Sequence, residues 1–493
     1  MNIPQEIKKI SSQLKKSGFE AYLVGGCLRD LILSEVEGQL SKPKDWDIAT
    51  NAKPEEIQKI FPDNVYENQF GTVGVKVETE DETLKVVEIT TFRKEGKYTD
   101  KRHPDAITFA KTIKEDLSRR DFTINAIALK LDAATLNENL VDPFDGQTDL
   151  KKKIIRAVGN PEERFQEDAL RLMRAVRFSA QLGFSIEFKT GQAVKNNSGL
   201  LEFIAKERIR VELEKLLMAK KAAEGVKEME KLGLLRYVIP ELREGIGVTQ
   251  NKHHIYTVFE HNFRSLDYAA ENNFPLDVRI ASLLHDVGKP KAKEGDGPDC
   301  TFYGHQIVGA RMTARILDRL RFAKKDLEKI SLLVREHMFV YDPETVSLAG
   351  VRRLLRRVGA ENIEDLLKLR EADRIGSGVP KAQPYRLRYL KAMIEKVRKD
   401  PVSPKMLKIN GNDVMTELKI EPGPKIGKIL AVLLEEILDD PKLNIKTKLT
   451  KRVEELNKLT ERELDALAEK AKQKAEDVQK RIDEEIKKKY FVK

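Results

Sequence analysis

Two aspartates two positions apart are the residues of this sequence best suited to hold catalytic metal ions. Asp45 and Asp47 lie in the segment Lys44-Asp-Trp-Asp-Ile48, which we predict to be a strand. Alternate side chains of a strand point to one face of the sheet, so both carboxylates would emerge together. Carboxylate oxygens bind Mg²⁺, and two such ions can activate an attacking hydroxyl and stabilise a leaving pyrophosphate. The pair therefore predicts nucleotidyl transfer, although a solvated strand end would carry the same two residues.

A pair of glycines precedes these aspartates. Gly25 and Gly26 lie between the apolar run that starts at Tyr22 and an amphipathic segment that contains Arg29. Because glycine has no side chain, backbone amides at a helix N-terminus can approach a triphosphate closely. We therefore expect a phosphate-binding turn here, with Arg29 on the first turn of the helix.

Further polar residues lie on the strands and turns that we predict downstream. Glu88 is a polar residue within an apolar strand and is a candidate third carboxylate on the same face, unless it pairs with Arg93 or Arg120. The segment Arg119-Arg-Asp-Phe-Thr-Ile-Asn125 puts two arginines at a strand edge. Guanidinium groups bind phosphate oxygens bidentately, and Asn125 can hydrogen-bond a sugar or the backbone.

Four residues at three-residue steps mark a predicted helix that follows the head. Asp168, Arg171, Arg174 and Arg177 would form one stripe along that helix. Such a stripe can be a ladder of ion pairs. Alternatively, an aspartate and an arginine offer acceptor and donor edges like those of a base, so the stripe can bind and select an incoming nucleobase.

Histidines are concentrated in one part of the chain. Six of the seven lie between positions 253 and 337, where the spacing of apolar residues is helical. Imidazole and carboxylate groups drawn from several helices can enclose one or two divalent transition-metal ions, and such a centre activates water for phosphoester hydrolysis. The residues concerned are His261, His285 with Asp286, His305, His337 and Asp373.

A mixed α/β region followed by helices must position these residues. The β-rich runs alternate with helical segments and lie near 21–24, 46–49, 72–77, 85–91 and 123–130. After residue 149 the β signal fades, and apolar residues recur at helical spacing between loops rich in Gly and Pro. We predict an α+β fold in which a mixed-sheet head precedes helical regions, the last of them highly charged from about residue 444.

Composition narrows the class of protein. The 493 residues carry a formal net charge of +10, which favours a polyanionic partner. Charged residues make up 34% and hydrophobic ones 40%, as in a soluble globular protein. No apolar run approaches the roughly 18 residues that a membrane span needs, and Cys27 and Cys300 are too few for a disulfide framework or a thiolate zinc site. We expect a cytoplasmic protein of several domains that does not associate with membranes.

A series of motifs occurs in a fixed order between about residues 20 and 220: GGCLRD, KDWD, EITTFR, RRDFTIN, DPFDGQTDL, FQEDALRLMRAVRF and KERIRVELEKLL. In these motifs and their order the sequence resembles the class II tRNA nucleotidyltransferase and bacterial poly(A) polymerase family. The resemblance implies an enzyme that uses CTP and ATP on the acceptor arm of tRNA. It implies that Gly26, Arg29 and Arg120 contact the nucleotide and that Asp45 and Asp47 bind Mg²⁺. The same resemblance assigns base recognition to Asp168, Arg171, Arg174 and Arg177.

The histidine-rich region resembles the HD phosphohydrolase superfamily. The pattern H…HD…D of that superfamily is met by His261, His285, Asp286 and Asp373, and two-metal members have additional ligands that His305 and His337 resemble. The resemblance implies a divalent transition metal such as Mn, Ni, Co or Fe. It also implies hydrolysis of phosphate monoesters or 2′,3′-cyclic phosphates. Together the two resemblances predict a nucleotidyltransferase head (1–155), a helical neck that recognises the base and RNA (156–245), a helical HD body (246–400) and a helical tail (401–493).

Several activities stay open at this point. The polar segment from Lys94 to Ile107 is similar to the mobile loop of full CCA-adding members, so we favour addition of the whole CCA end over addition of CC alone. An A-adding tRNA nucleotidyltransferase and a poly(A) polymerase are the alternatives within the family. From another class, an RNA-binding regulatory protein would use the HD site to sense a ligand.

Overall fold

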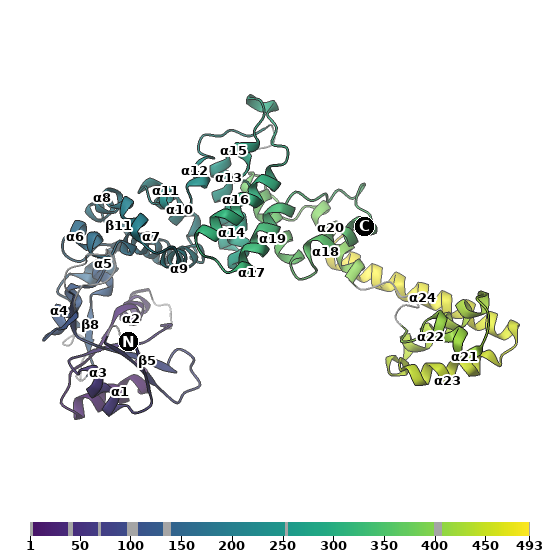
Figure 1. Cartoon of the computed structure of the whole chain (residues 1–493), viewed down its shortest axis with the longest axis horizontal. Coiled ribbons are helices and arrows are strands. Elements are labelled where there is room, and N and C mark those ends of the chain that lie inside the picture. The colour runs from purple at the N-terminus through teal and green to yellow at the C-terminus, as the bar shows by residue number, and fades with distance from the viewer. Residues whose placement is uncertain are drawn as a thin grey trace. The chain divides into compact units, whose positions relative to one another are not determined.

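The computed structural model describes residues 3–37, 43–67, 71–95, 107–131, 140–251, 255–398 and 407–492. The chain divides into two compact units, one formed by residues 1–337 and 364–380 and the other by residues 338–363 and 381–493. A mixed sheet lies in the N-terminal head, and helices make up most of the remaining chain (Figure 1). The predicted α+β class is confirmed.

A seven-stranded sheet forms the head, in the order β3-β4-β5-β2-β1-β8-β9. Its strands are β1 (Ala21–Val24), β2 (Asp47–Thr50), β3 (Asn64–Glu67), β4 (Thr72–Lys76), β5 (Val86–Thr91), β8 (Ala128–Lys130) and β9 (Leu140–Val141). β2 and β5 run parallel, and the other neighbours pair antiparallel. All four residues of β1 and three of the four in β2 are buried, because these central strands are covered on both faces.

The described residues of the head form five α-helices, namely α1 (Gln5–Lys16), α2 (Gly25–Glu37), α3 (Pro54–Ile60), α4 (Ile113–Ser118) and α5 (Gly146–Lys152). α1 buries Ile7, Ile10 and Leu14, whose spacing gives the helix one apolar stripe against β1. α2 follows β1 directly and packs on it. The predicted helix that carries Arg29 on its first turn corresponds to α2.

The predicted strand over residues 123–130 is wrong in its first half. Thr123–Asn125 forms a 3-10 turn, and within this predicted strand only the residues of β8 (Ala128–Lys130) pair with β1. Thr123 Oγ1 donates to Asp149 Oδ2 at 2.6 Å, and Asn125 Nδ2 donates to Asp121 Oδ1 at 3.1 Å. Buried hydrogen bonds from side chains therefore hold a turn where propensity favours a strand.

Helices of the neck follow the head in the same unit. They are α6 (Pro161–Glu167), α7 (Leu170–Leu182), α8 (Phe188–Asn196), α9 (Lys206–Leu217) and α10 (Ala222–Lys231). α7 packs against α9 and α10, and a short parallel pair, β10 (Ile154–Ile155) with β11 (Ser185–Ile186), joins the neck to the end of the head. α7 is the central helix of the neck, with most of its residues buried.

The body completes the first unit. Its main helices are α13 (Val258–Glu271), α14 (Leu276–Leu284), α16 (His305–Arg319), α17 (Lys324–Glu336) and α19 (Ile363–Gly376), with the short helix α15 (Lys289–Ala292). The short helices α11 (Leu235–Val238) and α12 (Pro240–Arg243) precede the body at the end of the neck. α13 packs on α14, and α17 packs on both α14 and α16. These helices bring residues more than a hundred positions apart into one core.

The second unit is helical throughout its described residues. It contains α18 (Leu348–Val358), α20 (Tyr385–Arg398), α21 (Gly411–Leu418), α22 (Pro424–Asp439), α23 (Lys446–Asn457) and α24 (Glu461–Tyr490). α24 is 30 residues long and buries only Leu464, Ala471 and Ile486, which agrees with the highly charged helical region predicted from about residue 444. Within the part of the chain that the structure describes, no helix is long and apolar enough to cross a membrane.

Candidate active site and metal centre

The glycine turn lies directly against the aspartates. In the sheet register Val24 of β1 is opposite Asp47 of β2, so the turn that follows β1 meets the start of β2. Gly25 has a φ of +76°, and a Cβ added there would lie 3.0 Å from Asp47 Oδ2 and 3.3 Å from Arg120 Nη1. Only glycine fits both the backbone conformation and the space. A Cβ on Gly26 would lie 4.0 Å from Asp45 Oδ1.

Three carboxylates lie together beside the glycine turn, on the central strands β2 and β5 and in the bend before β2. Asp47 is the register partner of Glu88 across the parallel pair β2 and β5. Asp45 lies in a bend just before β2, so the predicted strand begins two residues later than its first aspartate. Burial, followed by the charges of Glu88 and Asp45, raises the pKa of Asp47 to about 7, against the lowering effect of Arg120. The positive charge beside these carboxylates is too small to balance their negative charge, and Mg²⁺ prefers oxygen ligands of this kind. The site therefore suits Mg²⁺.

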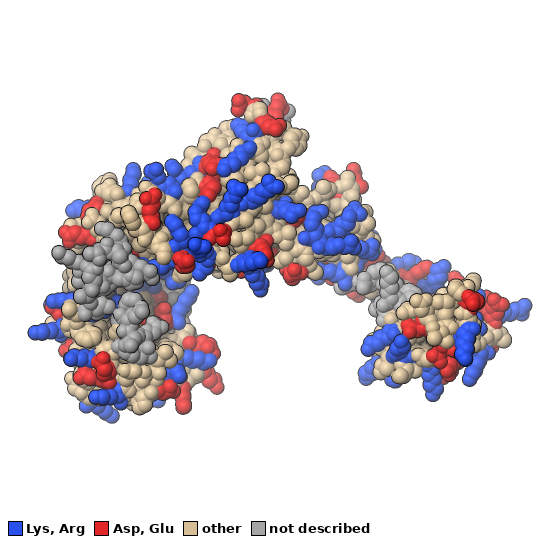
Figure 2. Space-filling view, in the orientation of Figure 1, with Lys and Arg blue, Asp and Glu red and all other residues tan. Residues whose placement is uncertain are grey.

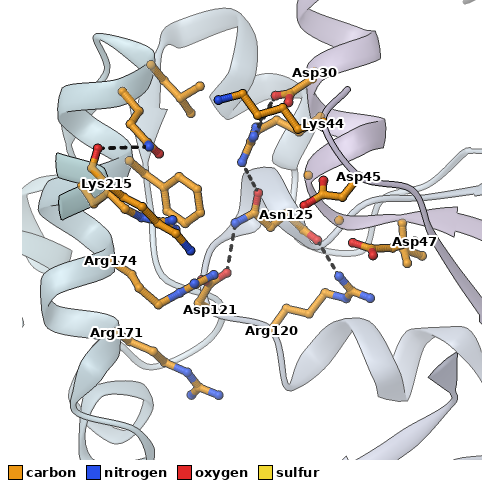
Figure 3. Close-up of a pocket in the computed structure, with 18 of the residues that line it drawn as sticks. Asp30, Lys44, Asp45, Asp47, Arg120, Asp121, Asn125, Arg171, Arg174 and Lys215 are labelled. Carbon is orange, nitrogen blue, oxygen red and sulfur yellow. Dashed lines mark hydrogen bonds and ion pairs between the residues drawn. The ribbon is translucent and has the colours of Figure 1, made fainter. Parts of the chain in front are cut away.

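A hydrogen-bonded network faces the carboxylates. Arg29 Nη1 donates to Asn125 Oδ1 at 2.9 Å, and Arg29 also forms an ion pair with Asp30 at 2.7 Å. Asn125 in turn donates to Asp121. Arg120 is oriented by Asp116, 3.3 Å from its Nη2, and by the carbonyl of Asn125. Figure 3 shows Asp45 and Asp47 on one side of the pocket with Arg120 and Asn125 beside them.

The predicted stripe of base-reading residues is not formed by one helix. Asp168 lies between α6 and α7, where its Oδ1 accepts a hydrogen bond from the Leu170 amide at 3.1 Å. This short-range bond favours a break in the helix, as aspartate often does near a helix start. Asp168 Oδ2 lies 3.2 Å from Arg208 Nη2. Arg171 donates to Glu167 and to the carbonyls of Arg164 and Arg119, and Figure 3 shows it apart from the carboxylates.

Arg174 and Arg177 are bound by buried acids. Arg174 Nε donates to Asp121 Oδ2 at 2.7 Å, and Arg177 Nε lies 2.9 Å from Glu212 Oε2. Burial opposes ionisation of Asp121, but the Arg174 guanidinium and a hydrogen bond from Asn125 outweigh it and hold the pKa of this carboxyl well below its usual range. Burial lowers the pKa of Arg177 to about 10, against the opposing charge of Glu212.

Most of these groups line one cleft of about 1470 Å³, which is larger than the roughly 300–1,000 Å³ of a typical small-molecule site. The cleft therefore has room for a nucleotide and for the end of a polymer beside it. Its wall includes each residue predicted for catalysis or nucleotide binding: Gly25, Gly26, Arg29, Asp45, Asp47, Glu88, Arg120, Asn125, Asp168, Arg171, Arg174 and Arg177. Sequence reasoning gave no role to Asp121 or Arg208, which also line it.

A second polar cluster lies inside the body. Its six residues are all less than 10% exposed: His261, His285, Asp286, His305, His337 and Asp373. The Nε2 atoms of His261 and His285 are 2.8 Å apart, and those of His305 and His337 are 3.4 Å apart. Ligands that share one metal ion at about 2.0–2.1 Å have separations of this size.

Asp286 connects the two pairs of histidines. Its Oδ2 lies 3.2 Å from His261 Nε2 and 3.4 Å from His285 Nε2, and its Oδ1 lies 3.4 Å from His305 Nε2 and 3.7 Å from His337 Nε2. Two groups of possible metal ligands therefore share this one carboxylate.

Backbone carbonyls fix the tautomers of three of these rings. The Nδ1 atoms of His285, His305 and His337 lie 2.6–2.9 Å from carbonyl oxygens, which only accept, so each Nδ1 carries the proton. The Nε2 atoms then present lone pairs to the interior, as metal-binding imidazoles do. Imidazole nitrogens with carboxylate oxygens suit divalent transition metals.

Two residues beside this cluster were missed by sequence reasoning. Lys289 is buried, and its Nζ lies 2.6 Å from Asp286 Oδ2. Gln250 Oε1 accepts from the same ammonium at 2.6 Å. Burial disfavours the charge on Asp286, but Lys289 and the histidines outweigh it and hold the pKa of this carboxyl well below its usual range. His253 and His254, which precede the cluster, lie outside the described residues.

Three protein-family models match the chain in the order of these features. Residues 21–156 match the Poly A polymerase head domain, residues 183–246 match the probable RNA and SrmB-binding site of polymerase A, and residues 258–377 match the HD domain. The head and the body thus define a polymerase-type nucleotidyltransferase with an HD domain.

Relatives narrow this class. The CCA-adding enzyme of Ligilactobacillus salivarius is 36% identical, and the match covers 89% of this chain and 93% of that enzyme. The A-adding tRNA nucleotidyltransferase of Deinococcus radiodurans is 39% identical, and the match covers 67% of this chain and 76% of that enzyme. The crystal structure of the Bacillus stearothermophilus CCA-adding enzyme in complex with CTP is 29% identical, with a TM-score of 0.59 over 93% of this chain and 98% of that one. The chain belongs to the tRNA nucleotidyltransferase family that includes the CCA-adding enzymes, which confirms the resemblance drawn from its motifs.

Proposed function

We propose that this chain builds or repairs the 3′ CCA end of tRNA from CTP and ATP. The observation that carries the proposal is the meeting of Asp45, Asp47 and Glu88 with the Gly25–Gly26 turn at the edge of an arginine-lined cleft. The names of full-length relatives support the same activity.

In this proposal the carboxylates hold the metal and the arginines hold the nucleotide. Asp45 and Asp47 would bind Mg²⁺, with Glu88 beside them, and the bound ions would favour loss of the proton from the attacking ribose hydroxyl and neutralise the leaving pyrophosphate. Amides of the glycine turn, with Arg29 and Arg120, would bind the triphosphate. Asp168, Arg171, Arg174 and Arg177 would position the base. Correct placement of the reacting atoms supplies much of the rate.

Exposed basic side chains support a polyanionic partner such as tRNA. Figure 2 shows Lys and Arg gathered over the body near α14 and α16, and over α18 of the second unit. Arg311 and Arg315 are exposed one turn apart on α16, and Arg352, Arg353 and Arg356 are exposed on α18. Each such group that neutralises a phosphate releases counterions, so binding should weaken as salt rises.

One assay separates the possible products. Labelled CTP and ATP would be offered, separately and together, to tRNA shortened by one, two or three nucleotides. Addition of CCA to the shortest tRNA is the expected result. Addition of A alone to tRNA that ends in CC would instead make this an A-adding enzyme, and a long tail from ATP alone would make it a poly(A) polymerase. The segment 96–106 within the loop that favours CCA addition lies outside the described residues.

We propose a second activity for the body, hydrolysis of phosphate monoesters or 2′,3′-cyclic phosphates. The two ligand groups that share the buried Asp286 carry this proposal. His261, His285, His305, His337 and Asp373 would complete a transition-metal centre that activates water. Protein supplied with Mn²⁺, Co²⁺ or Ni²⁺ should hydrolyse 2′,3′-cyclic AMP, and Asp373→Asn should lose this activity while CTP incorporation continues. If no such substrate is cleaved with any of these metals, the body is a binding or sensing domain.

We also propose that these activities lie in separate parts of the chain, with a head over 1–155, a neck over 156–245, an HD body over 246–400 and a tail over 401–493. The matched family models support the first three parts, since they fall within or close to these bounds.

A further inference from the structure

We propose that Phe178 is a positioning residue for nucleotide binding, and that it acts by holding three arginines of the cleft against the faces of its ring. The inference rests on the proposed function of the cleft. Phe178 is the last residue of the motif Arg174-Ala-Val-Arg-Phe178, and no role in the chemistry above falls to it. It is 6% exposed and lies in the wall of the cleft.

Three guanidinium groups surround one ring. The Cζ atoms of Arg29, Arg174 and Arg177 lie 5.3, 5.2 and 4.1 Å from the centroid of the Phe178 ring. Cations within about 6 Å of an aromatic centroid are attracted by the negative face of the ring. Phe122 packs edge to face against the same ring, with centroids 5.8 Å apart and an interplanar angle of 82°, which fixes the orientation of Phe178.

The three arginines come from different parts of the first unit. Arg29 lies on α2, directly after the phosphate turn, whereas Arg174 and Arg177 lie on α7 of the neck. The N–H groups of each guanidinium contact different polar side chains. Arg29 contacts Asn125 and Asp30, Arg174 contacts Asp121, and Arg177 contacts Glu212. The Phe178 ring is the one group among the described contacts that all three share. It therefore sets the spacing between the triphosphate arginine and the base-side arginines.

The three cations are close enough to repel one another. Burial lowers the pKa of Arg177, and the charges of Arg174 and Arg29 lower it further, against the raising effect of Glu212 and Asp121. Besides the carboxylates that pair with the individual arginines, the ring attracts all three cations without adding a further negative charge that would compete with the triphosphate. Phe178 thus preorganises a cationic pocket for an anionic ligand.

Graded fluorination of the ring tests this inference without changing its shape. Phenylalanines with one to four ring fluorines, which progressively weaken the negative face, would replace Phe178 in the full chain. We expect the KM for CTP and for ATP to rise stepwise to about tenfold, as three weak cation–π contacts predict. The value of kcat and the melting temperature should change little. Phe178→Trp, which retains an aromatic face, should keep more nucleotide affinity than Phe178→Leu, which retains only apolar volume.

Phe184 provides the matched control. It lines the same cleft and is 4% exposed, but within the described residues no cation lies over its ring. The same fluorinated series at Phe184 should leave both KM values unchanged. A flat series at Phe178 in an active enzyme, or equal effects at both positions, would overturn the inference. If the unmodified enzyme incorporated neither nucleotide, the proposed function would fail, and direct titration of CTP into the fluorinated proteins would still decide the role of Phe178.

Discussion

Gly25→Ala offers a direct test of how closely the phosphate turn and the aspartates must fit. The backbone at Gly25 has a φ of +76°, where an L-residue costs about 1–2 kcal/mol. The added methyl would also lie 3.0 Å from Asp47 Oδ2 and 3.3 Å from Arg120 Nη1, so at least one of these groups must move. Contacts of this length require the neighbouring groups to shift by a few tenths of an ångström. Since a displacement of about 1 Å at a catalytic group can cost about 100-fold in rate, we expect kcat/KM for CTP incorporation to fall about tenfold.

Gly18→Ala separates the effect on the site from the effect on the backbone. Gly18 has a φ of +89°, but a Cβ there would have no atom within 4 Å. Both variants should therefore lose a similar amount of stability, measured as the melting temperature, while only Gly25→Ala loses activity. Nearly full activity in Gly25→Ala, or an equal loss of activity in both variants, would show that the turn does not position Asp47.

Three further predictions concern the buried and carboxylate groups. Asp45→Asn and Asp47→Asn should each abolish nucleotide incorporation into tRNA, measured on gels, but leave the Kd for tRNA unchanged. Incorporation by both variants would refute the assignment of the metal ligands. Asp286→Asn should reduce the transition metal that the protein retains after dialysis, measured by elemental mass spectrometry, and unchanged metal content would contradict the shared-ligand geometry. Asp121→Asn should lower the melting temperature at pH 7. Burial opposes the charge on Asp121, but Arg174 holds the pKa of this carboxyl below the unfolded value of about 3.9. The carboxylate therefore stabilises the fold above that pH. The difference in melting temperature between Asp121→Asn and the wild type should narrow as the pH falls below about 4. A difference that stays constant with pH would count against the ion pair.

The spacing of residues close together in the sequence predicted those parts of the site that lie within one turn or one short segment. The closeness of Asp45 to Asp47 follows from their two-residue separation, although Asp45 lies in a bend before β2, and the glycines after an apolar strand require only the geometry of one turn. The histidine cluster was predictable as a set because so many rare residues lie in one helical region. The structure brings all six predicted residues together in one buried core.

The remaining parts depend on contacts between distant segments. Arg174 pairs with Asp121 across 53 positions, and Asp168 pairs with Arg208 across 40. No periodicity in the sequence encodes such partners, so a stripe of arginines appeared uniform although each has a different acid. The break before α7 was missed for a related reason, because it depends on one hydrogen bond from the Leu170 amide to Asp168.

The two proposed metal centres differ in both ligand chemistry and exposure, and these differences allow one chain to carry both. In the head, Asp45 and Glu88 are exposed at the edge of an open cleft, and all three candidate ligands are oxygen donors. Such a site suits Mg²⁺ that arrives and leaves with the nucleotide, because Mg²⁺ keeps much of its water and binds through few carboxylates. In the body, His261 and His285 are fully buried and nitrogen donors predominate, which favours a transition metal that stays bound. If both centres bind metal as proposed, their donor sets would direct different ions to them, and the concentration of free Mg²⁺ would control nucleotide addition without displacing the metal of the body.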